Sequence, residues 1–246
     1  MTRQLEVITL THLAIMILPI AAALLTYRMI GASIRRASHA LGRMLLQLTL
    51  IGYLLVFLFE SESSSLIILA LAVMLAAASW IALDATGTKT LRGYCNVFVA
   101  VSTASLVVLF LVTQGVLRIT PWYAPHTLIP LAGMIFSNSM NAVSLTAERY
   151  GAEVHRGQTP PVAKISAFEA SLIPVTNSLF AVGLVALPGM MTGQILAGID
   201  PLVAARYQIM VMTMIFSSSV FASAIYLHLL KYDQAELLPS GDDIRA

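Results

Sequence analysis

The chain has 246 residues, of which 58% are hydrophobic and 11% are charged, and its mean hydropathy is +0.85. A soluble domain carries about 25% charged residues, so this composition indicates an integral membrane protein. The net charge of +2 offers no basic surface for nucleic acid. A single cysteine, Cys95, excludes an intramolecular disulfide and any multi-cysteine metal site.

Charge-free apolar stretches recur along the chain at lengths that suit membrane helices. A spanning helix needs about 20 apolar residues, because the hydrocarbon core is about 30 Å thick. Arg43 would sit near the start of the second, short stretch and extend its polar end to the interface. The stretches predict an all-α, polytopic membrane protein with about seven helices, at 7–27, 44–59, 63–83, 93–117, 119–147, 170–199 and 207–230.

The distribution of Lys and Arg predicts the orientation of these helices. Seven spans place Arg3, Arg118 and Arg206 on one side of the membrane and the other 11 of the 14 Lys and Arg residues on the opposite side. Cytoplasmic loops carry the excess of positive charge. We therefore expect the N-terminus outside and the C-terminus in the cytoplasm.

Polar segments divide the chain into one membrane domain and a short tail. We expect a single transmembrane permease domain over 1–232 and a polar cytoplasmic tail over 233–246. The longer inside loops are expected at 27–41 and 148–169, and the second is the only sizeable polar segment between spans.

Motifs for catalysis or nucleotide binding are missing from the sequence. Gly87-Thr88-Lys89-Thr90 lacks the glycines of a phosphate-binding loop, and the zinc-protease pattern His-Glu-x-x-His does not occur. We therefore expect no catalytic residues, no cofactor bound by this chain, and energy that comes from a partner chain or an ion gradient. The metal ligands, if any, stay unknown from these motifs.

The predicted fifth span contains polar residues within an apolar helix. Asn138 and Asn141 are three residues apart and share a face, and Gly133, Ser137 and Ser144 continue it with small or polar groups. Met134 lies one turn before Asn138. Two interpretations stay open: the amides hold neighbouring helices together, or they line a polar pathway.

The predicted sixth span contains residues that interrupt a helix. Pro188-Gly189 is expected to break it, and non-helical backbone at membrane depth is tolerated only beside protein or a water-filled cavity. Broken helices often form transport sites. The soft thioethers of Met190 and Met191 follow the break, and Asn177 and Gln194 flank it. Adaptable Met packing at a proline kink is the simpler alternative.

Several segments resemble the FetB-type permeases, the membrane subunits of ABC transporters linked to iron export. The similarity is specific over about 126–212. It rests on Ile129-Pro130-Leu131-Ala132-Gly133-Met134-Ile135, the stretch 138–145, Ser171-Leu172-Ile173-Pro174, 182–185, Leu-Pro-Gly-Met-Met-Thr-Gly-Gln at 187–194, and Arg206-Tyr207-Gln208-Ile209-Met210.

The resemblance implies a function and partners. Such a permease would form a homodimer in the bacterial inner membrane, pair with a separate cytoplasmic ATPase that uses ATP, and export iron or a related metal. The segment 148–169 would then contact the ATPase, with candidate residues Glu148, Arg149, Arg156, Gly157, Thr159 and Pro160. Its Gly157-Gln158-Thr159-Pro160-Pro161 replaces the Leu-Gly-Ala-Thr-Pro that the family usually carries in a longer loop.

Three alternatives to iron export remain at this point. The chain could be a gradient-driven secondary transporter, an ABC permease for a non-metal substrate such as a sugar nucleotide, or a membrane scaffold without transport. If the chain is a transporter, its candidate substrate-pathway residues are Met134, Asn138, Asn141, Asn177, Pro188, Gly189, Met190, Met191 and Gln194.

Overall fold

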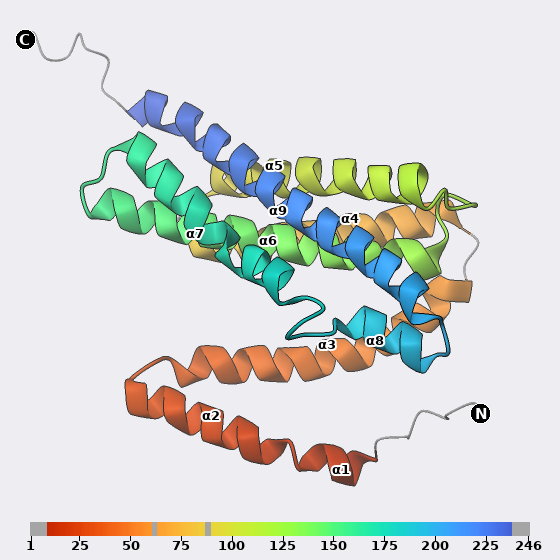
Figure 1. The fold of residues 1–246 in the computed structure, drawn as a ribbon. Coiled ribbons are helices and arrows are strands. Elements are labelled where there is room, and N and C mark those ends of the chain that lie inside the picture. Colours follow the sequence, from red (N-terminus) through yellow and green to blue (C-terminus); the bar gives the residue numbers. More distant parts are fainter. Residues whose placement is uncertain (1–8, 61–62, 87–89, 238–246) are drawn as a thin grey trace, which may run out of the picture. The chain divides into compact units, whose positions relative to one another are not determined.

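The computed structural model describes residues 9–60, 63–86 and 90–237, which are helical apart from short connections and one isolated bridge between Val182 and Ala186 (Figure 1). This confirms the predicted all-α class. The chain divides into two compact units, Met1–Glu62 and Ser63–Ala246. Most of the predicted polar tail, 238–246, lies outside the described residues, whereas 233–237 continue the last helix.

The first unit is a helical hairpin. Its elements are α1 (Leu10–Ala14), α2 (Ile17–Ile30) and α3 (Ile34–Glu60). Gly31 ends α2 in the left-handed conformation with φ of 82°, and its N–H bonds to the carbonyl of Arg28. The expected loop over 27–41 is therefore wrong, because helix occupies all of it except 31–33.

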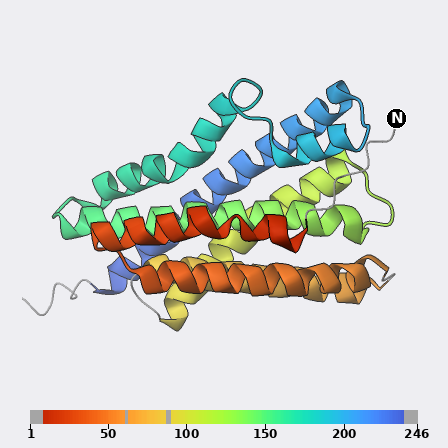
Figure 2. The ribbon, with the colours of Figure 1, turned by 90° about the horizontal axis from the view of Figure 1, so that it is seen from below.

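The second unit is a bundle in which α6 is central. It contains α4 (Ser64–Leu83), a short 3₁₀ turn (Asp84–Thr86), α5 (Leu91–Phe110) with a π-helical end (Leu111–Val116), α6 (Pro125–His155), α7 (Pro160–Ala181), α8 (Gly189–Leu196) and α9 (Pro201–Leu237). Helix α6 packs against α4, α5, α7 and α9. Both views show α9 running obliquely across α6 (Figures 1 and 2).

Six helices in the described part of the chain are long and apolar enough to cross a membrane. They are Thr11–Ile30, Ile34–Glu60, Ser64–Thr86, Leu91–Val116, Pro125–His155 and Pro201–Leu230. They match the predicted spans except 170–199, which is divided between α7 and α8. The count of seven helices and the sides of the two termini stay predictions.

The break between α7 and α8 comes earlier than the sequence suggested. Helix α7 ends at Ala181, whose carbonyl accepts bonds from the N–H groups of Val185 and Ala186. Gly183 turns the chain with φ of 84°. Pro188 then serves as the residue before the first turn of α8 and does not interrupt an existing helix.

Prolines inside α6 and α7 do not end those helices. Pro130 lies within α6 and Pro174 within α7, although each ring removes a backbone donor. Neighbouring helices stabilise such positions in membrane proteins. Gly133, expected on the polar face of this segment, faces α4 instead, because a Cβ atom there would lie 3.5 Å from Cε of Met74.

Small hydroxyl groups join the helices in the interior of the second unit. Ser105 of α5 donates to Ser139 of α6 over 3.1 Å, and Thr146 of α6 donates to Ser223 of α9 over 3.0 Å. Ser171 of α7 lies 3.3 Å from the same Ser223 hydroxyl. Small polar residues allow helices to approach closely in lipid and bond across the interface.

Candidate functional site

One face of α6 lines two cavities that follow one another along the helix. Met134 lines the first, and Asn138 and Asn141 line the second. Because a helix rises 1.5 Å per residue, Met134 and Asn141 are about 10 Å apart along its axis. Asn138 and Asn141 thus line one cavity together, and Met134 lies on the same face of α6; that this face forms a transport path stays a prediction.

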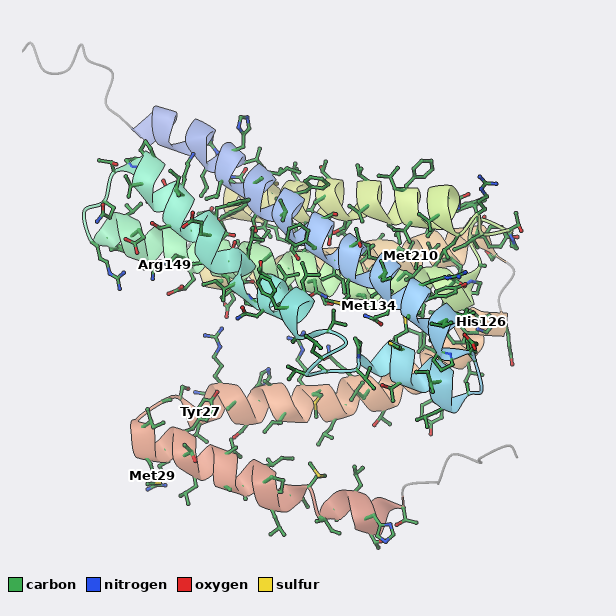
Figure 3. All side chains as sticks on the ribbon, in the orientation of Figure 1. Tyr27, Met29, His126, Met134, Arg149 and Met210 are labelled. Carbon is green, nitrogen blue, oxygen red and sulfur yellow. The ribbon has the colours of Figure 1, made fainter. Side chains whose placement is uncertain are left out.

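We call the first space the thioether cavity. It has a volume of about 260 Å³ and brings together Met134 of α6, Met190 of α8 and Met210 of α9. Figure 3 labels His126, Met134 and Met210 toward one end of the bundle. The lining residues are Leu117, His126, Thr127, Pro130, Leu131, Met134, Met190, Gln194, Ile199, Val203, Tyr207 and Met210.

The turn after α8 helps to hold this side of the thioether cavity. Gly198 takes φ of 89°, and the N–H of Ile199 bonds to the carbonyl of Gln194 over 3.0 Å. The side-chain oxygen of Gln194 is buried and has no hydrogen-bond partner within the described chain. Such an atom costs about 1–3 kcal/mol, so this wall of the cavity holds an unused acceptor.

We call the second space the amide cavity. It has a volume of about 180 Å³ and lies between α6, α7 and α9. Asn138 is half-buried and donates from Nδ2 to the carbonyl of Met134 over 2.8 Å. Its walls are Asn138, Asn141, Ala142, Leu145, Ser171, Pro174, Val175, Ser178, Met212, Ile215 and Ser219.

The other predicted pathway residues are spread over different surroundings. Met191 lines a third cavity of about 340 Å³ with Gln208, and Asn177 lines a fourth, also of about 340 Å³, with Glu169. Pro188 and Gly189 form the start of α8 and line none of these four cavities. The predicted set is therefore not one site.

Gln208 lines the third cavity and was not among the predicted pathway residues. Its side chain is buried, with 4% of its surface exposed, and Oε1 has no hydrogen-bond partner in the described residues. The polar residues of α9 were the available signal, because Gln208 lies inside a segment used for the family resemblance. Met210, Tyr207 and Ser219 were missed as cavity residues in the same way.

The segment expected to be a coupling loop is helical. Helix α6 extends to His155 and α7 begins at Pro160, so only 156–159 lie outside helix. The expected loop over 148–169 is wrong because Arg149 and Glu153 support the helix as an ion pair one turn apart. Pro160 occupies the first turn of α7, where its missing N–H costs nothing.

Ion pairs and a glycine turn define the shape of this hairpin end. Glu153 is buried, and its Oε1 lies 2.7 Å from Nη2 of Arg149 and 3.0 Å from Nη1 of Arg156. Gly157 takes φ of 82°, its N–H bonds to the carbonyl of Val154, and the next N–H bonds to the carbonyl of Glu153. This is a Schellman turn, which needs a left-handed residue.

The candidate coupling residues surround this turn. Glu148 and Arg149 lie on α6, Arg156 and Gly157 lie in the turn, and Thr159 and Pro160 begin the path into α7; all are exposed except the half-buried Arg149. Below the tip, Tyr150 packs with Ala163, Ala167 and Leu227. The structure brings these six residues to one end of the α6–α7 hairpin.

Comparison with known proteins decides the family. The model of the Uncharacterised protein family (UPF0014) matches residues 8–234. The chain belongs to the UPF0014 family. It is a multi-pass membrane protein, and this family assignment confirms the FetB-type resemblance drawn from the sequence.

Curated relatives cover most of the chain. A UPF0014 membrane protein of Synechocystis is 38% identical over 74% of this chain and 76% of its own length. The probable iron export permease protein FetB of Escherichia coli is 33% identical over 77% of this chain and 78% of its own. The Arabidopsis protein ALUMINUM SENSITIVE 3 is 32% identical over 75% and 72%. No solved structure gives a significant match.

Proposed function

We propose that this UPF0014 protein is the membrane-spanning permease subunit of an ABC transporter that exports iron or a related metal. The observation that carries the proposal is the face of α6 that lines both the thioether cavity and the amide cavity. A relative named as a probable iron export permease supports the direction and class of cargo. The proposed location is the bacterial inner membrane.

A separate ATPase would supply the energy. The sequence lacks a phosphate-binding loop, and the α6–α7 hairpin end offers a rigid, exposed contact surface around Arg156, Gly157 and Thr159. A helix connects this surface directly to the cavities, because Arg149 and Asn141 both belong to α6. Movement of the hairpin end by the ATPase would therefore reach the cavity walls. Two copies of this chain would form the proposed permease dimer.

Two other readings fit the cavities less well. A gradient-driven carrier usually needs ionisable groups at membrane depth. Neither the thioether nor the amide cavity has an Asp, Glu, Lys or Arg among its lining residues, and the one lining histidine, His126, lies in the first turn of α6. Sites for drug-sized ligands have volumes of about 300–1,000 Å³. Each of these two cavities is smaller, with volumes of about 180 and 260 Å³, which disfavours a sugar nucleotide.

Retention of radiolabelled iron tests the transport proposal. Cells loaded with iron would be compared with and without this chain, and with this chain but without its candidate ATPase. We expect faster iron loss only when both chains are present. Loss that persists without the ATPase would favour a gradient-driven carrier, and equal retention in all three strains, with the protein verified in the membrane, would reject iron as cargo.

Cysteine cross-linking tests the proposed ATPase contact. The exposed Cys95 would first be replaced by Ser, and Thr159→Cys would then place a thiol at the hairpin end. We expect this thiol to capture the ATPase. Leu202→Cys is the matched control, because Leu202 is 73% exposed near the start of α9. Equal cross-linking of the ATPase at both positions, or cross-linking only at position 202, would show that the ATPase does not bind at the hairpin end.

A further inference from the structure

We infer that the thioether cavity is a binding site for a soft monovalent cation, of which Cu(I) is the biological example. The inference rests on the proposed function and deepens its second part: it names the related metal as a soft monovalent cation, a class to which iron does not belong. The ligands are the three sulfur atoms of Met134, Met190 and Met210.

The convergence of the three methionines comes from the tertiary structure. Met134, Met190 and Met210 belong to α6, α8 and α9, and all three are half-buried around one space. The break between α7 and α8 makes this possible, because it produces a short separate helix that carries Met190. Three of the chain's 12 methionines thus line one cavity.

The residues that line the thioether cavity favour a soft metal ion of low charge. Thioethers are soft ligands that suit Cu(I), whereas carboxylates and water suit hard divalent ions. Burying an ion away from water is costly, and that cost rises with the square of the ionic charge. Since no Asp or Glu lines this cavity, a monovalent ion is favoured over a divalent one.

The rest of the described chain offers no competing hard site. Residues 9–60, 63–86 and 90–237 contain no group of three or more His, Cys, Asp and Glu side chains placed to hold a metal ion. Iron(II) sites in proteins commonly use imidazole and carboxylate ligands. The thioether cavity offers three sulfur atoms and a single imidazole, that of His126, with no carboxylate, and the amide cavity offers amide and hydroxyl groups.

A second observation marks the thioether cavity as a ligand site. Gln194 lines it, and the buried Oε1 atom of this residue has no hydrogen-bond partner within the described chain. Buried polar atoms in folded proteins nearly always have one. The oxygen is closed to water in this structure, so it would gain a partner when the amide turns toward an ion bound in the cavity.

Silver binding to the purified full chain tests the site. Ag(I) is a stable stand-in for Cu(I) with the same preference for sulfur ligands. All proteins would carry Cys95→Ser, because a free thiolate binds silver by itself. In lipid nanodiscs, followed by native mass spectrometry and calorimetry, we expect one silver ion per chain and its loss in the M134L/M190L/M210L variant.

The matched control removes the same number of sulfur atoms elsewhere. Met29, Met44 and Met74 line none of the described cavities, and M29L/M44L/M74L should bind silver like the parent protein. Equal binding by the cavity variant and the parent would overturn the inference. If the triple variant fails to fold, the single variant M190L replaces it in the experiment, because Met190 lies on the short helix α8. M190L should weaken silver binding at least tenfold. Unchanged silver affinity would overturn the inference.

The same variants separate this inference from the proposed function. ATPase-dependent iron loss without any silver site in the purified chain would overturn the soft-cation inference and leave the export proposal standing. A silver site that requires the three methionines, in a protein that exports no metal from cells, would support the binding inference while rejecting the export proposal.

Discussion

Asn138 donates a hydrogen bond of 2.8 Å from Nδ2 to the backbone carbonyl of Met134. These residues line different cavities, since Met134 belongs to the thioether cavity and Asn138 to the amide cavity. The bond therefore lies where one cavity gives way to the next along α6. The amide of Asn138 thus has a hydrogen-bond partner in the backbone of its own helix, and the residue still lines the amide cavity.

Replacing Asn141 with Leu should lower transport without unfolding the protein. Asn141 lines the amide cavity and is otherwise exposed, so its removal changes the polarity of the cavity more than the packing. We expect iron efflux to fall about tenfold, as for loss of a polar contact worth about 1.4 kcal/mol. Unfolding would be followed by thermal denaturation in detergent, with a change below about 1 kcal/mol.

Ser137→Ala is the control for this experiment. Ser137 is exposed on α6, donates to the carbonyl of Met134 over 3.2 Å, and does not line the amide cavity. Its efflux should match the parent protein. If Asn141→Leu transports normally while Ser137→Ala is also normal, the amide cavity is not on the transport path.

Two glycines near the hairpin end should respond in opposite directions to alanine. Gly157 has φ of 82°, whereas Gly151 lies inside α6, and a Cβ atom at either position would meet nothing within 4 Å. Only the backbone conformation therefore distinguishes them. We expect Gly157→Ala to destabilise the protein by about 1–2 kcal/mol and Gly151→Ala to stabilise it by up to about 1 kcal/mol. The measurement is unfolding by denaturant in mild detergent, and an equal shift for both would contradict the turn geometry.

Thr146→Val should loosen the contact between α6 and α9. The Thr146 hydroxyl is buried, and it lies 2.7 Å from the carbonyl of Ala142 and 3.0 Å from the Ser223 hydroxyl. Interhelical bonds of this kind contribute about 0.6 kcal/mol on average in a membrane protein, so we expect a loss of about 0.6 kcal/mol in unfolding free energy. Thr213→Val is the control, because the exposed Thr213 bonds only to its own helix at Ile209; its loss should be smaller.

Gln208→Met should raise stability and lower transport together. The buried Oε1 of Gln208 has no hydrogen-bond partner in the described residues, and methionine has a similar shape without that oxygen. We expect a gain of about 1 kcal/mol in unfolding free energy. Efflux should fall if the oxygen serves the cavity that it shares with Met191. A variant that is less stable than the parent would mean that Oε1 of Gln208 has a hydrogen-bond partner when the protein lies in the membrane.

Some elements could be predicted from the sequence because they depend on local length and composition. The apolar stretch at 63–83 and the observed helix Ser64–Leu83 agree closely, since about 20 apolar residues have few alternatives in a bilayer. The prediction of a loop over the coupling segment, 148–169, was wrong because composition alone did not decide its structure. Charged residues suggested a loop, but Arg149 and Glu153 are spaced for an ion pair on a helix and extend α6 to His155.

Only part of the candidate site could be predicted from the sequence, namely the residues that share one helix. Asn138 and Asn141 could be grouped because they are three residues apart on one helix. Met210 could not be grouped with Met134 and Met190, because no spacing along the chain relates α9 to α6 and α8. Met190 and Met191, adjacent in sequence, line different cavities, because successive residues of a helix point about 100° apart.

Hydropathy and motifs are properties of short segments, so they suffice to predict that this protein is helical, that it lies in a membrane and to which family it belongs. Which polar and sulfur-bearing side chains meet depends on how the helices pack. In the tertiary structure α7 ends at Ala181, α8 is a separate short helix and α9 lies across α6. Cavities form where helices fail to fill the space between them, and that depends on packing between segments that are distant in sequence.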